Sequence, residues 1–164
     1  MKRNIRPTTL ALSAFAMFVL SMAPLAHAQQ CSLAGAAGTY GFTGTGTLLL
    51  PTGPVPVAAI GKITLNADGS VSGTEARSIG GVFADETIGP GTWTVNPDCT
   101  GTLTAKVFES GVLVRTSVLS LVFDDNMREG RLLQKSLMLP DNTNLPVVIT
   151  FKTRRIFTND SRTE

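Results

Sequence analysis

Five charged residues lie on strand faces that are otherwise apolar, and these side chains are the best placed to do chemistry. Residues two apart in an extended strand share a face, so alternation groups each charge with apolar neighbours. The five are Glu75, Arg77, Glu86, Arg115 and Arg155. Charges inside a domain need partners or a ligand, because an unpaired buried ion costs several kcal/mol. We therefore take these residues as candidate binding residues for a small, partly polar or anionic ligand held in an interior cavity.

The same charges also have a purely structural interpretation. A single β-bulge reverses the face of every later residue in its strand. Glu75, Arg77, Glu86 and Arg115 would then form cross-strand ion pairs on the solvated face. The first interpretation predicts a ligand-binding protein. The second predicts a structural or interaction module of the cell envelope that has no small-molecule ligand.

Catalytic and metal-binding motifs are missing from the sequence. The only histidine, His27, lies in an N-terminal segment that we expect to be removed, and without imidazole a Ser-His-Asp or Cys-His nucleophile pair cannot form. Two carboxyls could hydrolyse a glycoside, but six phenylalanines, Tyr40 and Trp93 are few aromatics for holding sugar rings. Asp68 and the run 124–126 suit turns and lack the further oxygen ligands of a calcium loop. The sequence predicts no enzymatic activity, no cofactor and no metal.

The N-terminus has the organisation of a secretory signal. Three basic residues, Lys2, Arg3 and Arg6, precede an apolar run over residues 10–20, and Ala26-His27-Ala28 provides a small-x-small cleavage site. We predict a signal peptide over residues 1–28, cleavage after Ala28, and a single all-β domain over 29–164. That domain would lie in the periplasm or outside the cell.

The expected mature domain is close to neutral. Removal of the signal leaves 11 of the 14 basic residues against 12 acidic ones. A nucleic-acid partner would need clustered basic residues to neutralise phosphates, so we predict none. No other segment is long and apolar enough to span a bilayer as a helix, and the sequence leaves the oligomeric state open.

Cys31 and Cys99 are the only cysteines. Export places them in a compartment where disulfides persist, so we expect one bridge, with two unpaired buried cysteines as the alternative. On the chain-entropy estimate the bridge would stabilise the fold by about 4 kcal/mol at most. A lipid anchor on Cys31 is disfavoured, because Gln30 stands where a small residue is required.

Short runs of alternating residues, separated by Gly, Pro, Asn and Asp, must position these side chains, and this pattern is typical of an all-β chain. Residues 127–139 could form a helix or a strand, and we favour a strand. Three prolines predict a loop over 51–56. The sequence predicts an antiparallel meander closed into an eight- or nine-stranded barrel, with a two-sheet β-sandwich as the alternative. The expected strands cover residues 39–50, 57–65, 70–79, 82–88, 92–95, 102–109, 112–123 and 147–157.

A resemblance to exported barrels of the calycin type, the lipocalins and avidins, follows from a few residues. Gly38-Thr39-Tyr40 resembles the lipocalin Gly-x-Trp motif of the first strand. Arg154 or Arg155 then corresponds to the arginine that packs over that ring. Residues 31–35 look like the opening of an avidin, but Trp93 alone does not supply the tryptophans that surround biotin, so biotin binding is not implied. The chain is also similar to small exported bacterial proteins with Gly-Thr-rich strands, which implies compartment and shape only.

Overall fold

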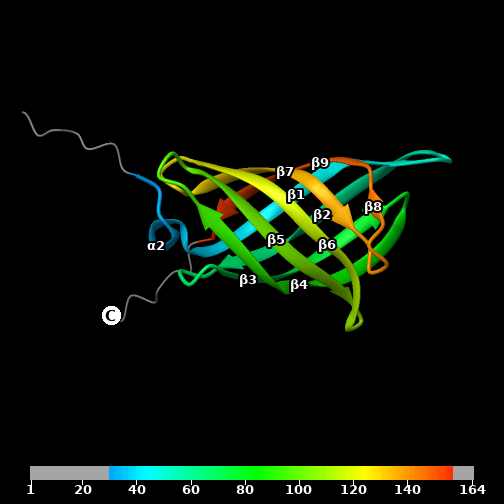
Figure 1. Cartoon of the computed structure of the whole chain (residues 1–164), viewed down its shortest axis with the longest axis horizontal. Helices are drawn as coiled ribbons and strands as arrows, with labels where there is room; N and C mark the ends of the chain where they lie inside the picture. Colours follow the sequence, from blue (N-terminus) through cyan, green and yellow to red (C-terminus); the bar gives the residue numbers. More distant parts are fainter. Residues whose placement is uncertain (1–29, 157–164) are drawn as a thin grey trace, which may run out of the picture.

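A computed structural model describes residues 30–156, which form one antiparallel sheet preceded by a short helix (Figure 1). The expected signal peptide, its cleavage site and the last residue of the strand expected over 147–157 lie outside the described residues. The elements are α2 (Leu33–Ala36), β1 (Gly38–Leu50), β2 (Gly53–Leu65), β3 (Ser70–Ile79), β4 (Val82–Val95), β5 (Thr100–Glu109), β6 (Val112–Asp124), β7 (Glu129–Met138), β8 (Asn144–Leu145) and β9 (Val147–Arg155).

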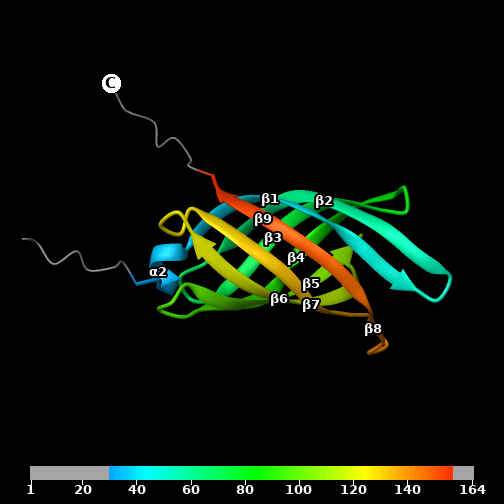
Figure 2. The same ribbon diagram turned by 90° about the horizontal axis from the view of Figure 1, so that it is seen from above.

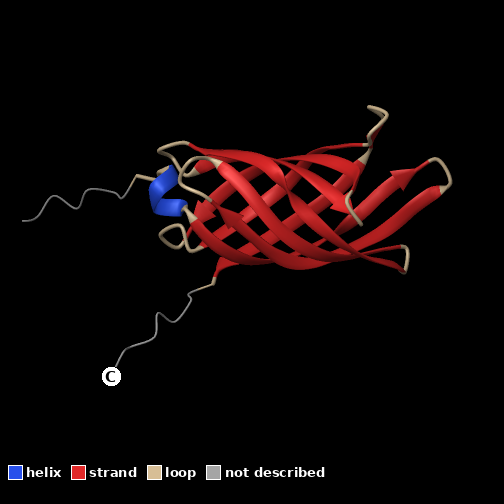
Figure 3. Cartoon of the chain, turned by 90° about the horizontal axis from the view of Figure 1, so that it is seen from below, coloured by secondary structure: helices blue, strands red, loops and turns tan. Residues whose placement is uncertain are grey.

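The sheet closes on itself as a barrel of eight strands. The strand order is β6-β5-β4-β3-β2-β1-β9-β7, and β6 also pairs with β7, which removes both edges. The two-residue strand β8 adds to β7 near one end. Figures 2 and 3 show the strands winding obliquely around a common axis, with α2 at one end. The predicted closed barrel is confirmed. Eight strands enclose an interior just wide enough for side chains or one small ligand.

Aspartate side chains fix the turns at the end of the barrel that carries α2. In the β2–β3 turn, Asp68 Oδ1 accepts hydrogen bonds from the backbone N–H and hydroxyl of Ser70, at 2.8 and 2.7 Å. In the β4–β5 turn, Asp98 Oδ1 accepts the same pair from Thr100, at 3.0 and 2.7 Å. These bonds hold the pKa of both carboxyls below its ordinary value. The aspartates are therefore part of the turns.

The loop predicted over residues 51–56 is wrong, because β2 already begins at Gly53. The carbonyl of Pro56 accepts a hydrogen bond from Gly80 N at 2.9 Å, so the ring nitrogen of the same residue also faces the β3 side. Pro54, two residues earlier, has the same orientation. Because β3 ends before this point, neither proline removes a ladder hydrogen bond.

The two strands expected over residues 82–88 and 92–95 are a single strand, β4. The register of β4 against β5 shifts here, so that Gly89 and Pro90 together lie opposite Lys106. A bulge of this kind absorbs the extra residue without ending the strand. The ambiguous stretch 127–139 contains strand β7, as favoured, whereas α2 and β8 were not predicted.

Aromatic side chains fill the barrel at the α2 end. Trp93 is 2% exposed, and its Nε1 donates a hydrogen bond to the carbonyl of Asn66 at 2.9 Å. The ring of Phe123 lies between it and Tyr40, with centroid separations of 6.2 and 6.1 Å. This end of the barrel is therefore packed.

Helix α2 covers the packed end and is held there by two kinds of link. The Tyr40 hydroxyl donates to the carbonyls of Ala36, at 2.7 Å, and Met127, at 2.8 Å. The disulfide between Cys31 and Cys99 is present and joins the segment before α2 to the β4–β5 turn. The predicted bridge is thus confirmed. The described residues contain no helix of sufficient length and apolar character to cross a membrane.

Two glycines on the inner face make room for aromatic rings. A Cβ placed on Gly44 would lie 2.4 Å from Phe151 Cδ1, and one on Gly61 would lie 2.6 Å from Phe42 Cζ. The Phe42 and Phe151 rings meet edge to face, with centroids 6.1 Å apart. These rings make the wall formed by β1, β2 and β9 largely apolar. It faces the charged wall described next.

Candidate functional site

Four of the five candidate residues meet inside the barrel. Glu75 and Arg77 come from β3, Glu86 from β4 and Arg115 from β6, and all four are buried or half-buried. Their alternation with apolar residues correctly predicted the inward face. The alternative placement on the solvated face is wrong, although ion pairing, which that interpretation invoked, is present. Whether these residues bind a ligand stays a prediction.

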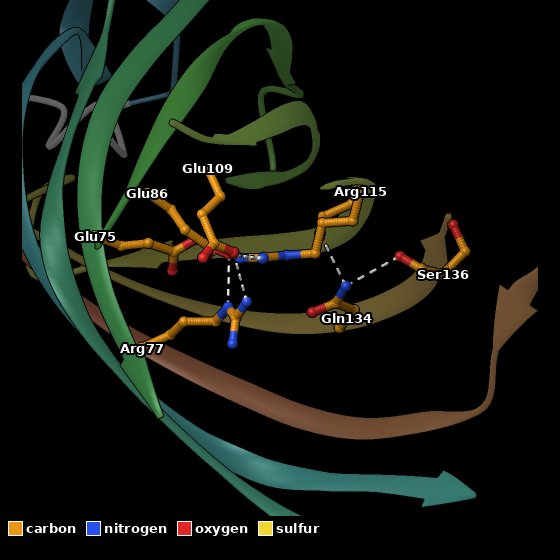
Figure 4. Close-up of polar contacts among 8 residues, drawn as sticks. Glu75, Arg77, Glu86, Glu109, Arg115, Gln134 and Ser136 are labelled. Atoms are coloured by element: carbon orange, nitrogen blue, oxygen red, sulfur yellow. Dashed lines mark hydrogen bonds and ion pairs between the residues drawn. The ribbon is translucent and has the colours of Figure 1, made fainter. Parts of the chain in front are cut away.

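The charged side chains form one connected network (Figure 4). Arg115 Nη1 donates to both oxygens of Glu86, at 2.8 and 2.7 Å, and its Nη2 donates to Glu75 Oε1. Arg77 Nε donates to Glu86 Oε1 at 2.6 Å, and Arg77 Nη2 donates to Glu109 Oε2 at 3.2 Å. Glu86 is thus shared by both guanidinium groups. We refer to these five residues as the ion cluster.

Burial makes the ion cluster an environment unlike bulk water. The side chain of Glu86 is 0% exposed and that of Glu75 is 5% exposed. Burial raises the pKa of Glu75 above its ordinary value, and the neighbouring carboxylate of Glu86 raises it further. The positive charges of Arg115 and Arg77 act in the opposite direction and only partly offset the burial. Burial of Glu75 therefore favours its protonated form relative to an exposed carboxyl.

Sequence reasoning missed three polar residues of the site. Glu109 completes the ion cluster, and its alternation with Leu103, Ala105 and Val107 along β5 could have revealed it. Gln134 and Ser117 are also buried and inward, joined by a hydrogen bond from Gln134 Nε2 to Ser117 Oγ at 3.0 Å. Gln134 lies in the stretch whose secondary structure the sequence left open, so its face could not be assigned.

Arg155 lies apart from the ion cluster, at the α2 end. Its Nη2 donates to the backbone carbonyls of Gly35, at 2.9 Å, and Ala37. Its guanidinium carbon lies 5.5 Å from the centroid of the Tyr40 ring. This is the arginine-over-ring arrangement that the calycin resemblance implied for Arg154 or Arg155. Arg155 does not line the interior cavity, and its contacts are those of a residue that holds the barrel end closed.

An interior cavity of about 190 Å³ runs along the ion cluster. It extends from Tyr40 and Phe123 at the packed end to Leu139 and Leu145 at the opposite end. Most of the lining is aliphatic or aromatic. The polar side chains on its wall are Glu75, Arg77, Arg115, Ser117, Gln134 and Thr153, with the ring of Tyr40 at its base. The cavity therefore combines an apolar space with a polar zone concentrated on β3, β6 and β7.

The carboxylates of the ion cluster are all hydrogen-bonded to arginine. Residues 30–156 contain no group of three or more His, Cys, Asp or Glu side chains placed to hold a metal ion. Each carboxylate of the ion cluster is bonded to arginine, which opposes use of any of them as a general base. The geometry can hold the polar end of a small molecule and enclose an apolar body.

Neither a protein-family model nor a curated protein matches this chain. The eight-stranded closed barrel is compatible with a calycin-like fold. Function must accordingly be argued from the cavity itself.

Proposed function

We propose that this chain is an exported, non-enzymatic binding protein that holds a small ligand inside its barrel. The ligand would have an apolar body and a polar end. The cavity of about 190 Å³ is the observation that carries the proposal. An apolar cavity of about 150 Å³ is sufficient to bind benzene, so a body of about one ring with a short chain fits this space.

The distribution of polar groups supports a ligand with two unlike ends. Glu75, Arg77 and Gln134 are among the polar residues that line the cavity, and Phe42 and Phe151 are among the apolar ones. Binding sites for small molecules are mostly apolar with a few polar groups that fix orientation. A purely structural barrel could fill the same volume with leucine or phenylalanine, which would be more stable than an empty cavity.

Export is supported by the arrangement of residues 1–28 and by the disulfide. The basic start, the apolar run and Ala26-His27-Ala28 match a cleavable signal. The Cys31–Cys99 bridge fits an oxidising compartment. Mass spectrometry of the protein from the medium or periplasm should give a chain that begins at Gln29. An uncleaved chain that still begins at Met1 and is found in the cytoplasm alone would refute export.

Native mass spectrometry of the protein purified from its exported pool tests the binding proposal. We expect a mass excess that disappears when the protein is unfolded, and saturable binding of an apolar fluorescent probe to the emptied protein. A protein at its bare mass that binds no such probe would refute the proposal and favour the structural module.

A pair of variants on β3 locates the binding to the interior. Ile79 lines the cavity, whereas the preceding residue of β3, Ser78, faces the outer surface. Ile79→Trp should fill part of the cavity and weaken probe binding at least tenfold, with far-ultraviolet circular dichroism confirming that the protein is folded. Ser78→Trp, the matched control, should leave binding unchanged. Equal binding by both variants would place the probe outside the barrel.

A further inference from the structure

Three glutamates form a row across neighbouring strands of the barrel wall. Glu75 on β3 lies directly opposite Glu86 on β4, and Glu86 lies directly opposite Glu109 on β5. Like charges directly opposite one another destabilise a sheet. Among residues 30–156 only Arg77 and Arg115 pair with the row, so the ion cluster has one more carboxylate than guanidinium groups. With all five groups ionised its formal charge is −1.

The surplus is located at the cavity wall, on Glu75. Arg115 donates to Glu75 Oε1 through Nη2, and no described residue donates to Glu75 Oε2. Glu86, in contrast, receives hydrogen bonds on both oxygens. Glu86 and Glu109 do not line the cavity, whereas Glu75 does. Figure 4 shows the carboxylates gathered between the two guanidinium groups. A ligand in the cavity therefore meets an acceptor oxygen.

Gln134 presents a second acceptor, independently of the ion cluster. Its Nε2 donates to Ser117 Oγ at 3.0 Å and to the backbone carbonyl of Ser136 at 3.1 Å. A backbone carbonyl cannot donate, so this contact identifies the nitrogen of the amide, and both of its hydrogens are used. The carbonyl oxygen of Gln134 has no partner among residues 30–156, although the residue is only 7% exposed and lines the cavity.

Arg77 has one nitrogen that is free to donate, but the charge of its guanidinium group is already compensated by carboxylates. Arg77 keeps Nη1 without a partner in the described part of the chain, but its other nitrogens contact two carboxylates, those of Glu86 and Glu109. An anionic ligand would meet no uncompensated positive charge and would have to displace a glutamate. A cationic ligand would instead bring the formal charge of the site to zero and donate to the open oxygen of Glu75.

We infer that the polar end of the ligand is a primary ammonium group, which would donate a hydrogen bond to Glu75 Oε2. The inference rests on the proposed binding function and names the class of its ligand. It replaces the anionic ligand considered from the sequence. The body attached to the nitrogen is apolar and about the size of one ring, because the remaining lining is apolar and the cavity measures about 190 Å³.

Three probes with one body and different ends test the inference on the exported, emptied protein: 3-phenylpropylamine, 3-phenylpropanol and 3-phenylpropanoate. Calorimetry at neutral pH should show the amine binding at least tenfold more tightly than the alcohol, and no binding of the carboxylate. Equal or tighter binding of the carboxylate would overturn the inference and leave the proposed function intact. If none of the three binds but the apolar fluorescent probe does, the inference again fails alone. If no probe of any kind binds, the proposed function fails with it.

Two glutamate variants assign the selectivity to its residue. Glu75→Gln removes the surplus charge while keeping an acceptor for Arg115, and should weaken amine binding at least tenfold with little effect on the alcohol. Glu129→Gln, on β7 with a side chain 45% exposed, is the matched control and should bind as the unmodified protein does. Amine binding that survives Glu75→Gln unchanged would overturn the inference. The comparison of the three probes uses the unmodified protein. It therefore tests the inference even if Glu75→Gln does not fold.

Discussion

Replacing Arg115 with methionine should destabilise the barrel by about 3–5 kcal/mol at neutral pH. Arg115 makes three hydrogen bonds, two to Glu86 and one to Glu75. Methionine keeps much of the apolar length of the side chain but none of the charge. Glu75 would then have no arginine partner and Glu86 would keep only Arg77. Removing one partner of a buried ion pair costs about 3–5 kcal/mol because a buried charge is left uncompensated.

The cost should shrink as the pH is lowered. Burial already raises the pKa of Glu75, and Arg115 is the strongest influence that lowers it. Without Arg115 the folded-state pKa of Glu75 rises further, whereas the unfolded carboxyl titrates at about 4.3. Between those two pKa values the folded variant binds more protons than the unfolded chain. Its stability therefore increases as the pH falls through the folded-state pKa and stops increasing below the unfolded one.

Urea unfolding followed by the fluorescence of Trp93, the only tryptophan, measures both effects. Arg131→Met is the control, because Arg131 is 74% exposed in its ion pair with Asp124 and should contribute less than about 1 kcal/mol. Adding Glu75→Gln to Arg115→Met should recover part of the loss at neutral pH. A cost for Arg115→Met below about 1 kcal/mol, or one that grows on acidification, would refute the account of the ion cluster.

Three further outcomes can be checked separately. Replacing Cys31 and Cys99 by serine opens a link between residues 68 positions apart and should lower the free energy of unfolding by about 4 kcal/mol on the chain-entropy estimate, seen as a lower urea midpoint; an unchanged midpoint would contradict it. Gly44→Ala should cost about 1–3 kcal/mol because its Cβ would lie 2.4 Å from Phe151 Cδ1, and a smaller side chain at position 151 should recover part of that loss, which thermal unfolding of both proteins would detect. Tyr40 is the only tyrosine, and burial raises its pKa above 10.0, so its phenolate absorbance should appear at higher pH than that of the unfolded chain and stability should fall as the pH rises past 10; titration at the free-tyrosine pKa would show that the ring is not buried.

The alternation of residue types and the turn residues were sufficient to predict most of the strands. Residues 70–79 were predicted as a strand with the bounds that β3 has, because Asp68 and Gly80 punctuate it at both ends. The same alternation placed Glu75 and Arg115 on the inner face. What the sequence did not reveal depends on pairing partners: Pro54 and Pro56 are tolerated in β2 only because β3 has ended beside them.

The candidate site was recovered in part for the same reason. Glu75 and Arg77 share a face within one strand, and this is visible in the sequence. The third glutamate of the row, Glu109, joins them only through the register of β4 against β5, which a single chain segment does not encode. Arg155 has the right alternation but lies at the other end of the barrel, because position along the axis depends on strand stagger.

The glutamate row also limits which register the strands can adopt while the barrel assembles. A slip of one residue between β3 and β4 would turn Glu86 to the outer surface, because strand side chains alternate with a period of two. Arg77 and Arg115 would then be enclosed without their shared partner. Ile88 and Trp93, the buried apolar side chains of β4, would turn outward with it. The ion cluster thus adds a polar requirement to the apolar one, and both are met in the register that the barrel has.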